Sequence, residues 1–143
     1  MKTAKFLFLA IAMLLCGTTL KAQKPVVDGV WKIKSVKDGG KLLDLSAKET
    51  TVEINVKAKT ILAYVGCNRM NAKFEFITSD QIKPFALAST RKACHGETET
   101  IENATRYALE QTNSIRKNGA RIEFFKDNDL LIVLERPAAK KKK

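Results

Sequence analysis

The sequence has few residues suited to catalytic chemistry. A single histidine and three cysteines occur among 143 residues, and neither a CxxC nor an HxxxH spacing is present. Nucleophilic catalysis needs a reactive group beside a base, and metal sites need several ligands at characteristic spacings. We therefore expect no catalytic residues, no metal and no cofactor, and we expect that the protein is not an enzyme.

Long hydrophobic runs are also absent. The longest, Phe6 to Gly17, is too short to span a bilayer and follows two lysines without an acid. This pattern is typical of a signal peptide, which we place at residues 1–22. Ordinary cleavage after Ala22 is our first expectation. The alternative is a lipoprotein anchored at Cys16, although Leu15 is larger than the residue that usually precedes a lipidated cysteine.

The positive charge is largely terminal. The formal net charge is +11, but three lysines lie in the predicted signal peptide and four form a tail, so residues 23–137 carry only about +4. The chain has neither a basic stripe nor a recognition helix, so we predict that it does not bind nucleic acid. The basic tail, residues 138–143, would be a solvated end or make weak contact with an anionic surface through Lys140, Lys141, Lys142 and Lys143.

Export changes the meaning of the remaining cysteines, Cys67 and Cys94. An even pair in an oxidising compartment predicts a disulfide, and closing the intervening loop would contribute about 3–4 kcal/mol. A metal site using these two and His95 is the alternative. A Cys94–His95 catalytic pair is disfavoured because neighbours in an extended chain point in opposite directions.

The hydrophobic patterns predict strands, then one helix, then strands. Apolar residues recur on one helical face between Glu97 and about Thr112, and acidic residues crowd the first turns, where the helix dipole favours them. The predicted strands are residues 29–37, 51–57, 60–65, 73–77, 114–117, 121–125 and 130–135, with a weaker one at 81–87 that contains Pro84. This order indicates an α+β fold: a curved antiparallel sheet or partly open β-barrel with one helix packed on it.

We expect one core in which Trp31 and the helix residues Ile101, Ala108 and Leu109 meet the inward face of the strand that follows residue 50. That face consists of Val52, Ile54 and Val56. The alternative for Trp31 is an exposed ring on which a ligand stacks, but a lone tryptophan in a first strand is more often buried.

Several segments together resemble the META/HslJ family. The most specific are Gly66-Cys67-Asn68 and, further along, Ser89-Thr90 followed by three residues and Cys94. The other matching residues are Gly29 to Ile33, Glu102, Leu109, Arg121 to Phe124 and Leu130 to Val133. The resemblance makes Trp31, Gly66, Asn68 and Thr90 structural motif residues. Where the family usually has glycine this chain has Ala72, which argues against a positive-φ turn there and leaves Asn71 as the alternative.

The resemblance implies a small β-rich half-barrel with a helix at residues 23–137, in a periplasmic, secreted or lipid-anchored protein. Some members are associated with heat shock, and the family offers no established catalytic residues to transfer. We therefore expect a non-enzymatic envelope protein that is stress-related or binds an unknown envelope partner. The alternative is a carrier of a small apolar or lipid ligand in the half-barrel interior, which would need an apolar pocket of about 300 Å3 or more.

Overall fold

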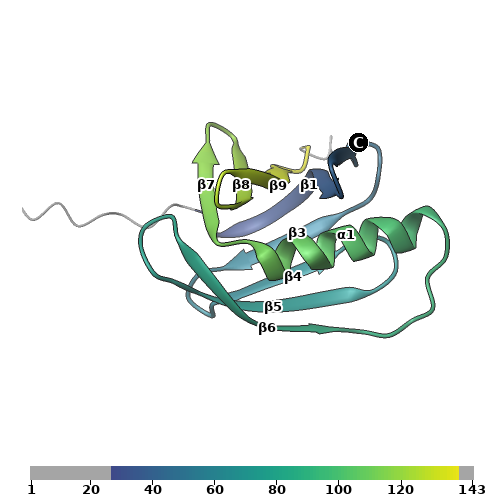
Figure 1. The fold of residues 1–143 in the computed structure, drawn as a ribbon, viewed down its shortest axis with the longest axis horizontal. Coiled ribbons are helices and arrows are strands. Elements are labelled where there is room, and N and C mark those ends of the chain that lie inside the picture. The colour runs from purple at the N-terminus through teal and green to yellow at the C-terminus, as the bar shows by residue number, and fades with distance from the viewer. Residues whose placement is uncertain (1–26, 139–143) are drawn as a thin grey trace, which may run out of the picture.

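The computed structural model describes residues 27–138, which form nine strands and one helix (Figure 1). The elements in chain order are β1 (Gly29–Asp38), β2 (Lys41–Asp44), β3 (Thr51–Asn55), β4 (Thr60–Tyr64), β5 (Arg69–Phe76), β6 (Ile82–Ser89), α1 (Glu97–Gln111), β7 (Ser114–Asn118), β8 (Arg121–Lys126) and β9 (Asp129–Glu135). The predicted signal peptide, with Cys16, and the lysines of the predicted tail lie outside the described residues.

All strands belong to one antiparallel sheet with the order β6-β5-β4-β3-β1-β9-β8-β7, and β2 pairs only with the end of β1. The long strand β1 joins the two halves of this sheet. Its first residues pair with β3, whereas Lys32 to Val36 pair with β9 across a register shift between Ile33 and Ser35. A bulge of this kind increases the local twist. The sheet therefore curls around β1, as the predicted α+β architecture requires.

The two outer strands, β6 and β7, meet at one end only. The Ile82 N–H donates to the Asn113 carbonyl at 2.9 Å, and the Ile115 N–H donates to the Asp80 carbonyl at 2.7 Å. A single bridge, Gln81 to Ser114, completes this contact. Beyond it the two edges separate, so the sheet remains an open half-barrel.

Helix α1 lies across the sheet, between the β5–β6 side and the β1–β9 side (Figure 1). The predicted helical face is the buried one, since Ile101, Ala104, Thr105, Ala108 and Leu109 are all shielded from solvent. The helix ends where Thr112 takes an extended conformation, and the Thr112 N–H and hydroxyl both donate to the Ala108 carbonyl. In the part of the chain that the structure describes, no helix is long and apolar enough to cross a membrane.

The predicted core is confirmed. Trp31 is 2% exposed and belongs to one buried cluster that includes Val52, Ile54 and the apolar face of α1, although Val56 is only partly buried. The indole N–H donates to the Val27 carbonyl at 2.8 Å, and the Arg136 guanidinium lies 3.7 Å from the ring centroid. Because Arg136 covers the ring and the core surrounds it, Trp31 is not an exposed stacking platform.

Local expectations differ from the structure at several places, and β5 begins at Arg69 rather than at residue 73. Strand β2 was not predicted, and Ala72 and Asn71 are regular residues of β5, so neither takes a positive φ. The weak strand extends to Ser89 in spite of Pro84, which lies on an outer strand beside a register shift. A proline is tolerated at such a position because its missing N–H costs no sheet hydrogen bond.

Candidate functional site

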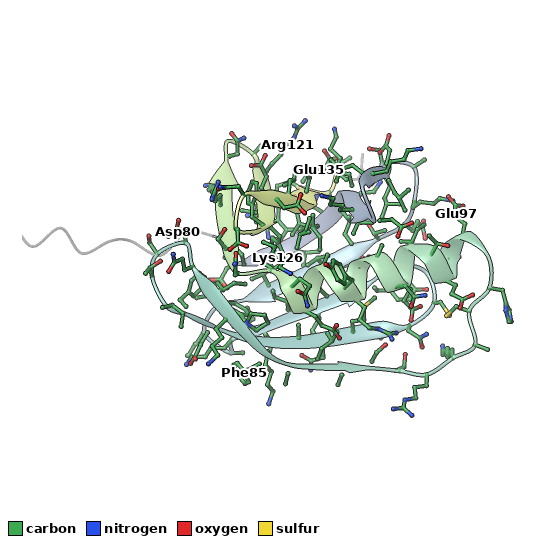
Figure 2. The ribbon with its side chains drawn as sticks, in the orientation of Figure 1. Asp80, Phe85, Glu97, Arg121, Lys126 and Glu135 are labelled. Atoms are coloured by element: carbon green, nitrogen blue, oxygen red, sulfur yellow. A yellow bond between two sulfur atoms is a disulfide. The ribbon has the colours of Figure 1, made fainter. Side chains whose placement is uncertain are left out.

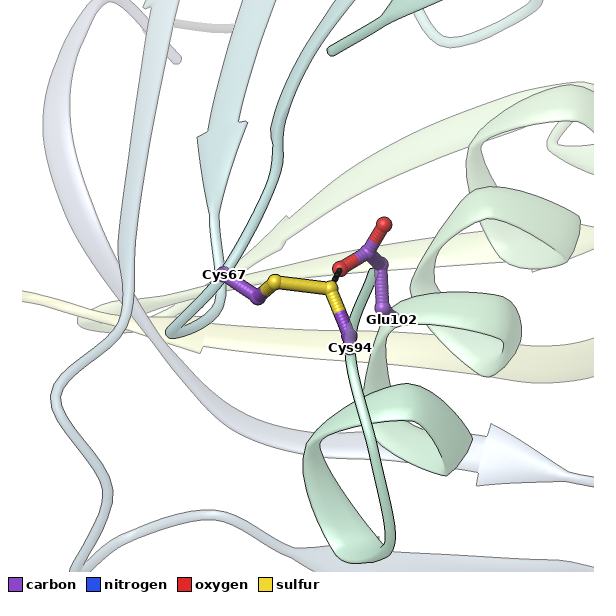
Figure 3. A group of neighbouring side chains, drawn as sticks. All are labelled: Cys67, Cys94 and Glu102. Carbon is purple, nitrogen blue, oxygen red and sulfur yellow. Dashed lines mark hydrogen bonds between the residues drawn. A yellow bond between two sulfur atoms is a disulfide. The ribbon is translucent and has the colours of Figure 1, made fainter. Parts of the chain in front are cut away.

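A disulfide ties the turn between β4 and β5 to the segment that leads into α1 (Figure 3). Cys67 follows Gly66, which has a φ of +112°, and it is bonded to Cys94 with the two Cα atoms 6.2 Å apart. A positive φ of this kind favours glycine, so Gly66 turns the chain where β4 ends. The predicted pairing of the two cysteines is confirmed.

Asn68, beside that disulfide, is 3% exposed and connects two further segments. Its Oδ1 accepts hydrogen bonds from the Thr90 hydroxyl at 2.7 Å and from the Lys92 N–H at 2.8 Å. Its Nδ2 donates to the Lys92 carbonyl at 3.1 Å and to Glu102 Oε1 at 2.7 Å. The motif residues Gly66, Asn68 and Thr90 are thus brought together, and their role in this geometry is to hold the 90–96 loop against α1.

Glu102 is a buried acid that the sequence analysis placed in the acidic helix start and among the residues that resemble the META/HslJ family, without assigning it a contact. It is 3% exposed, and its Oε2 accepts from the Asn68 N–H at 3.2 Å. The same oxygen lies 3.1 Å from Cys94 Sγ (Figure 3). The signal in the sequence was the family resemblance, in which Glu102 follows Cys94 by eight residues.

The sulfurs of Cys67 and Cys94 and a carboxylate oxygen of Glu102 all lie within 4.8 Å of one another. Such a group could bind a thiophilic metal only if both sulfurs were free thiolates. The disulfide removes both thiolates, so the oxidised chain has no three-ligand set here. His95, the third ligand of the sequence-based alternative, is exposed and is not part of this group.

An open groove runs along α1 beside this cluster. At the start of the helix it has a volume of about 470 Å3 and is lined by the 90–95 loop, Glu99, Glu102, Asn103 and Arg106. An adjoining part of about 360 Å3 shares Thr90, Arg91 and Arg106 with it and extends to Leu87 and Glu110. A third part of about 260 Å3, lined by residues 84–87, Leu109 and Glu110, continues along β6. We call these three connected parts the α1 groove.

Arg106 occupies the middle of the α1 groove. Its Nη2 lies 3.4 Å from Glu102 Oε1, and its Nε is buried without a hydrogen-bond partner among the described residues. The side chain as a whole is 41% exposed. A guanidinium has five N–H donors, so Arg106 retains donors for an acceptor that enters the groove.

The fold and the groove define a class of protein: a small α+β domain with an open antiparallel sheet and one helix that a disulfide anchors. The family comparison agrees, because the META domain model matches residues 24–138. The chain therefore belongs to the META domain family.

The fold is also shared with a solved structure. An NMR structure of a protein from Burkholderia xenovorans superposes with a TM-score of 0.60 at 20% sequence identity, covering 78% of this chain and 83% of that one. At this identity the similarity concerns the fold alone. A comparison with curated proteins gives no match.

Proposed function

We propose that this META domain protein is an exported, non-enzymatic envelope protein that binds a partner through the α1 groove, in support of the cell surface under stress. The observation that carries the proposal is the groove itself, a long open surface with mainly polar walls and a central arginine that has unused donors. Binding needs no more than such a surface and a few oriented side chains.

The chemistry beside the groove favours binding over catalysis. Cys94 is in a disulfide and has no thiol to act as a nucleophile. His95 has no hydrogen bond or ion pair within the described chain, and Glu102 is engaged by Asn68 and Arg106. A general acid–base pair needs two groups within hydrogen-bonding reach in a cleft, and these residues do not form one.

The disulfide is consistent with an oxidising compartment and therefore with export. We propose that the signal peptide is removed after Ala22 and that the mature protein is periplasmic or secreted, with lipidation at Cys16 as the alternative. The carrier function is less well supported, because large buried side chains such as Trp31, Phe74 and Phe124 fill the concave side of the sheet.

A crosslinking experiment in the producing bacterium tests this function. A photo-crosslinking amino acid at Asn103, which lines the α1 groove, should capture an envelope component, whereas the same group at Lys117 on the exposed part of β7 should not. Mass spectrometry of both protein and lipid in the adduct separates partner binding from lipid carriage. Equal capture at both positions, or none, would contradict the proposal.

A further inference from the structure

The geometry points to an extended, acidic peptide segment of the partner as the occupant of the α1 groove. The segment adds to the free edge of β6 as an extra strand and places a carboxylate on Arg106. This inference rests on the proposed partner-binding function and names the chemistry of the partner.

The first support is the unpaired edge of β6. The Thr90 N–H donates toward β5, to the Arg69 carbonyl at 3.1 Å, and Ala88 pairs with Asn71 in the same register. Because backbone groups alternate in an antiparallel strand, those of Leu87 and Ser89 face away from β5. Within residues 27–138 nothing pairs with them, so they form a template for an added strand.

The ends of this template are defined. Toward the β7 side the edge is already used, since the Ile82 N–H donates to Asn113. Pro84 then supplies no donor. The available edge is therefore the part between Phe85 and Ser89, and it borders the two parts of the α1 groove that contain Leu87 and Glu110. Figure 2 places Phe85, which is 56% exposed, along β6 at the margin of the sheet.

The second support is charge. The two parts of the groove nearest the start of α1 share two charged residues, Arg91 and Arg106. Glu99 lines only the part at the start of the helix, and Glu110 lines the two parts along β6. The buried Glu102 is already bonded to Asn68 and paired with Arg106. Arg91 and Arg106 therefore place positive charge near the Ser89 end of the β6 edge, and Glu110 lies on the groove wall beside that edge. Arginine binds a carboxylate through two parallel N–H bonds, and the Arg106 side chain is 41% exposed, so its guanidinium can accept such a pairing.

The probe for the test is a phage-displayed library of random linear peptides, selected on the chain from Gln23 onward. We expect the enriched sequences to alternate apolar and polar residues and to have Asp or Glu at a fixed position. Binding of the best synthetic peptide is then measured by fluorescence anisotropy. Replacing its acid with the amide, or N-methylating alternate backbone nitrogens, should each weaken binding about tenfold or more.

Variants of the protein assign the contacts. Arg106→Gln should weaken binding of the acidic peptide about tenfold or more, with little effect on the amide peptide, and Arg106→Lys should fall between. Ser89→Pro should abolish strand addition while the domain stays folded, because the Ser89 N–H faces away from β5. The matched control is Lys117→Pro, at the equivalent outward position of β7, and it should bind normally. Circular dichroism confirms that each variant is folded.

Three results would overturn the inference. The first is selection of peptides without an acid, or of none. The second is a dimer in analytical ultracentrifugation that Ser89→Pro dissociates, which would assign the β6 edge to a second copy of this chain. The third is capture of an envelope partner from Asn103 that neither Arg106→Gln nor Ser89→Pro affects. In that last case the proposed function would stand and only the peptide model would fail.

Discussion

Asn68 makes the hydrogen bonds that hold the 90–96 loop against α1. Because its side chain is buried, water cannot replace the partners in these bonds. We predict that Asn68→Ala lowers the free energy of unfolding by about 3 kcal/mol, because it removes one donor to the buried Glu102 carboxylate and leaves the Lys92 N–H and carbonyl without their partner. Urea denaturation at neutral pH measures this difference.

The matched control is Asn71→Ala, three residues further along in β5, where the side chain is exposed and should contribute almost nothing. A loss at Asn68 no larger than at Asn71 would show that the buried network does not stabilise the domain.

Asp44 provides a test of electrostatics at the surface. The Ser46 hydroxyl and N–H both donate to its carboxylate, and these bonds, with a weaker attraction to Lys34, hold the pKa of Asp44 below its usual value of 3.8. A depressed folded-state pKa stabilises the fold above the unfolded pKa, and this contribution disappears as the pH falls through the folded value. Asp44→Asn should therefore be slightly less stable than the wild type at pH 7 and equally stable near pH 2. A difference that persists at pH 2 would contradict this.

At the scale of elements, the disulfide connects the β4–β5 turn to the start of α1 across a sequence separation of 27 residues. We predict that Cys67→Ala/Cys94→Ala lowers the free energy of unfolding by about 3–4 kcal/mol, mainly because the unfolded chain gains freedom. The wild type with dithiothreitol should match this double variant, and the double variant itself should not respond to the reductant. Equal stability of reduced and oxidised protein would mean that the loop is ordered without the bond.

The strongly periodic elements were predictable from the sequence. Helix α1 was predicted to within one residue because its apolar face and its acidic start agree with one another, and the 51–65 hairpin was clear from alternation. Strand β2 has only four residues and depends on pairing with the end of β1, so local pattern could not reveal it. The start of β5 was missed although Met70 and Ala72 alternate with polar residues, because Arg69 directly follows the Gly66-Cys67-Asn68 turn motif.

For the whole molecule, the arrangement of the two sheet edges makes a measurable prediction. The amides of Ile82 and Ile115 are bonded across the β6–β7 contact, whereas those of Leu87 and Ser89 face away from the sheet. In native-state hydrogen exchange we expect the first pair to exchange at least about tenfold more slowly than the second. Protection of Leu87 and Ser89 in the isolated protein would mean that the β6 edge is already covered.

The candidate site was only partly predictable. The cysteine pair and the Asn68 and Thr90 motif followed from residue types and spacing. The groove could not be predicted from the sequence. It forms where β6, the 90–96 loop and α1 pack together, and the pattern of any one segment does not show which other segments it contacts. Arg106 looked like an ordinary exposed helix residue, and its significance depends on a buried Nε that only tertiary structure shows.

The position of β1 in the middle of the sheet also affects the order of assembly. Its neighbours are β3, which follows soon after it, and β9, the last strand of the domain. A chain that emerges from its N-terminus can form the β3–β4–β5 meander early, but β1 cannot acquire its second neighbour until residues 129–135 have emerged. Closing so large a loop is entropically slow. The domain therefore stays incomplete during most of its own synthesis and can close only after its last strand has been made.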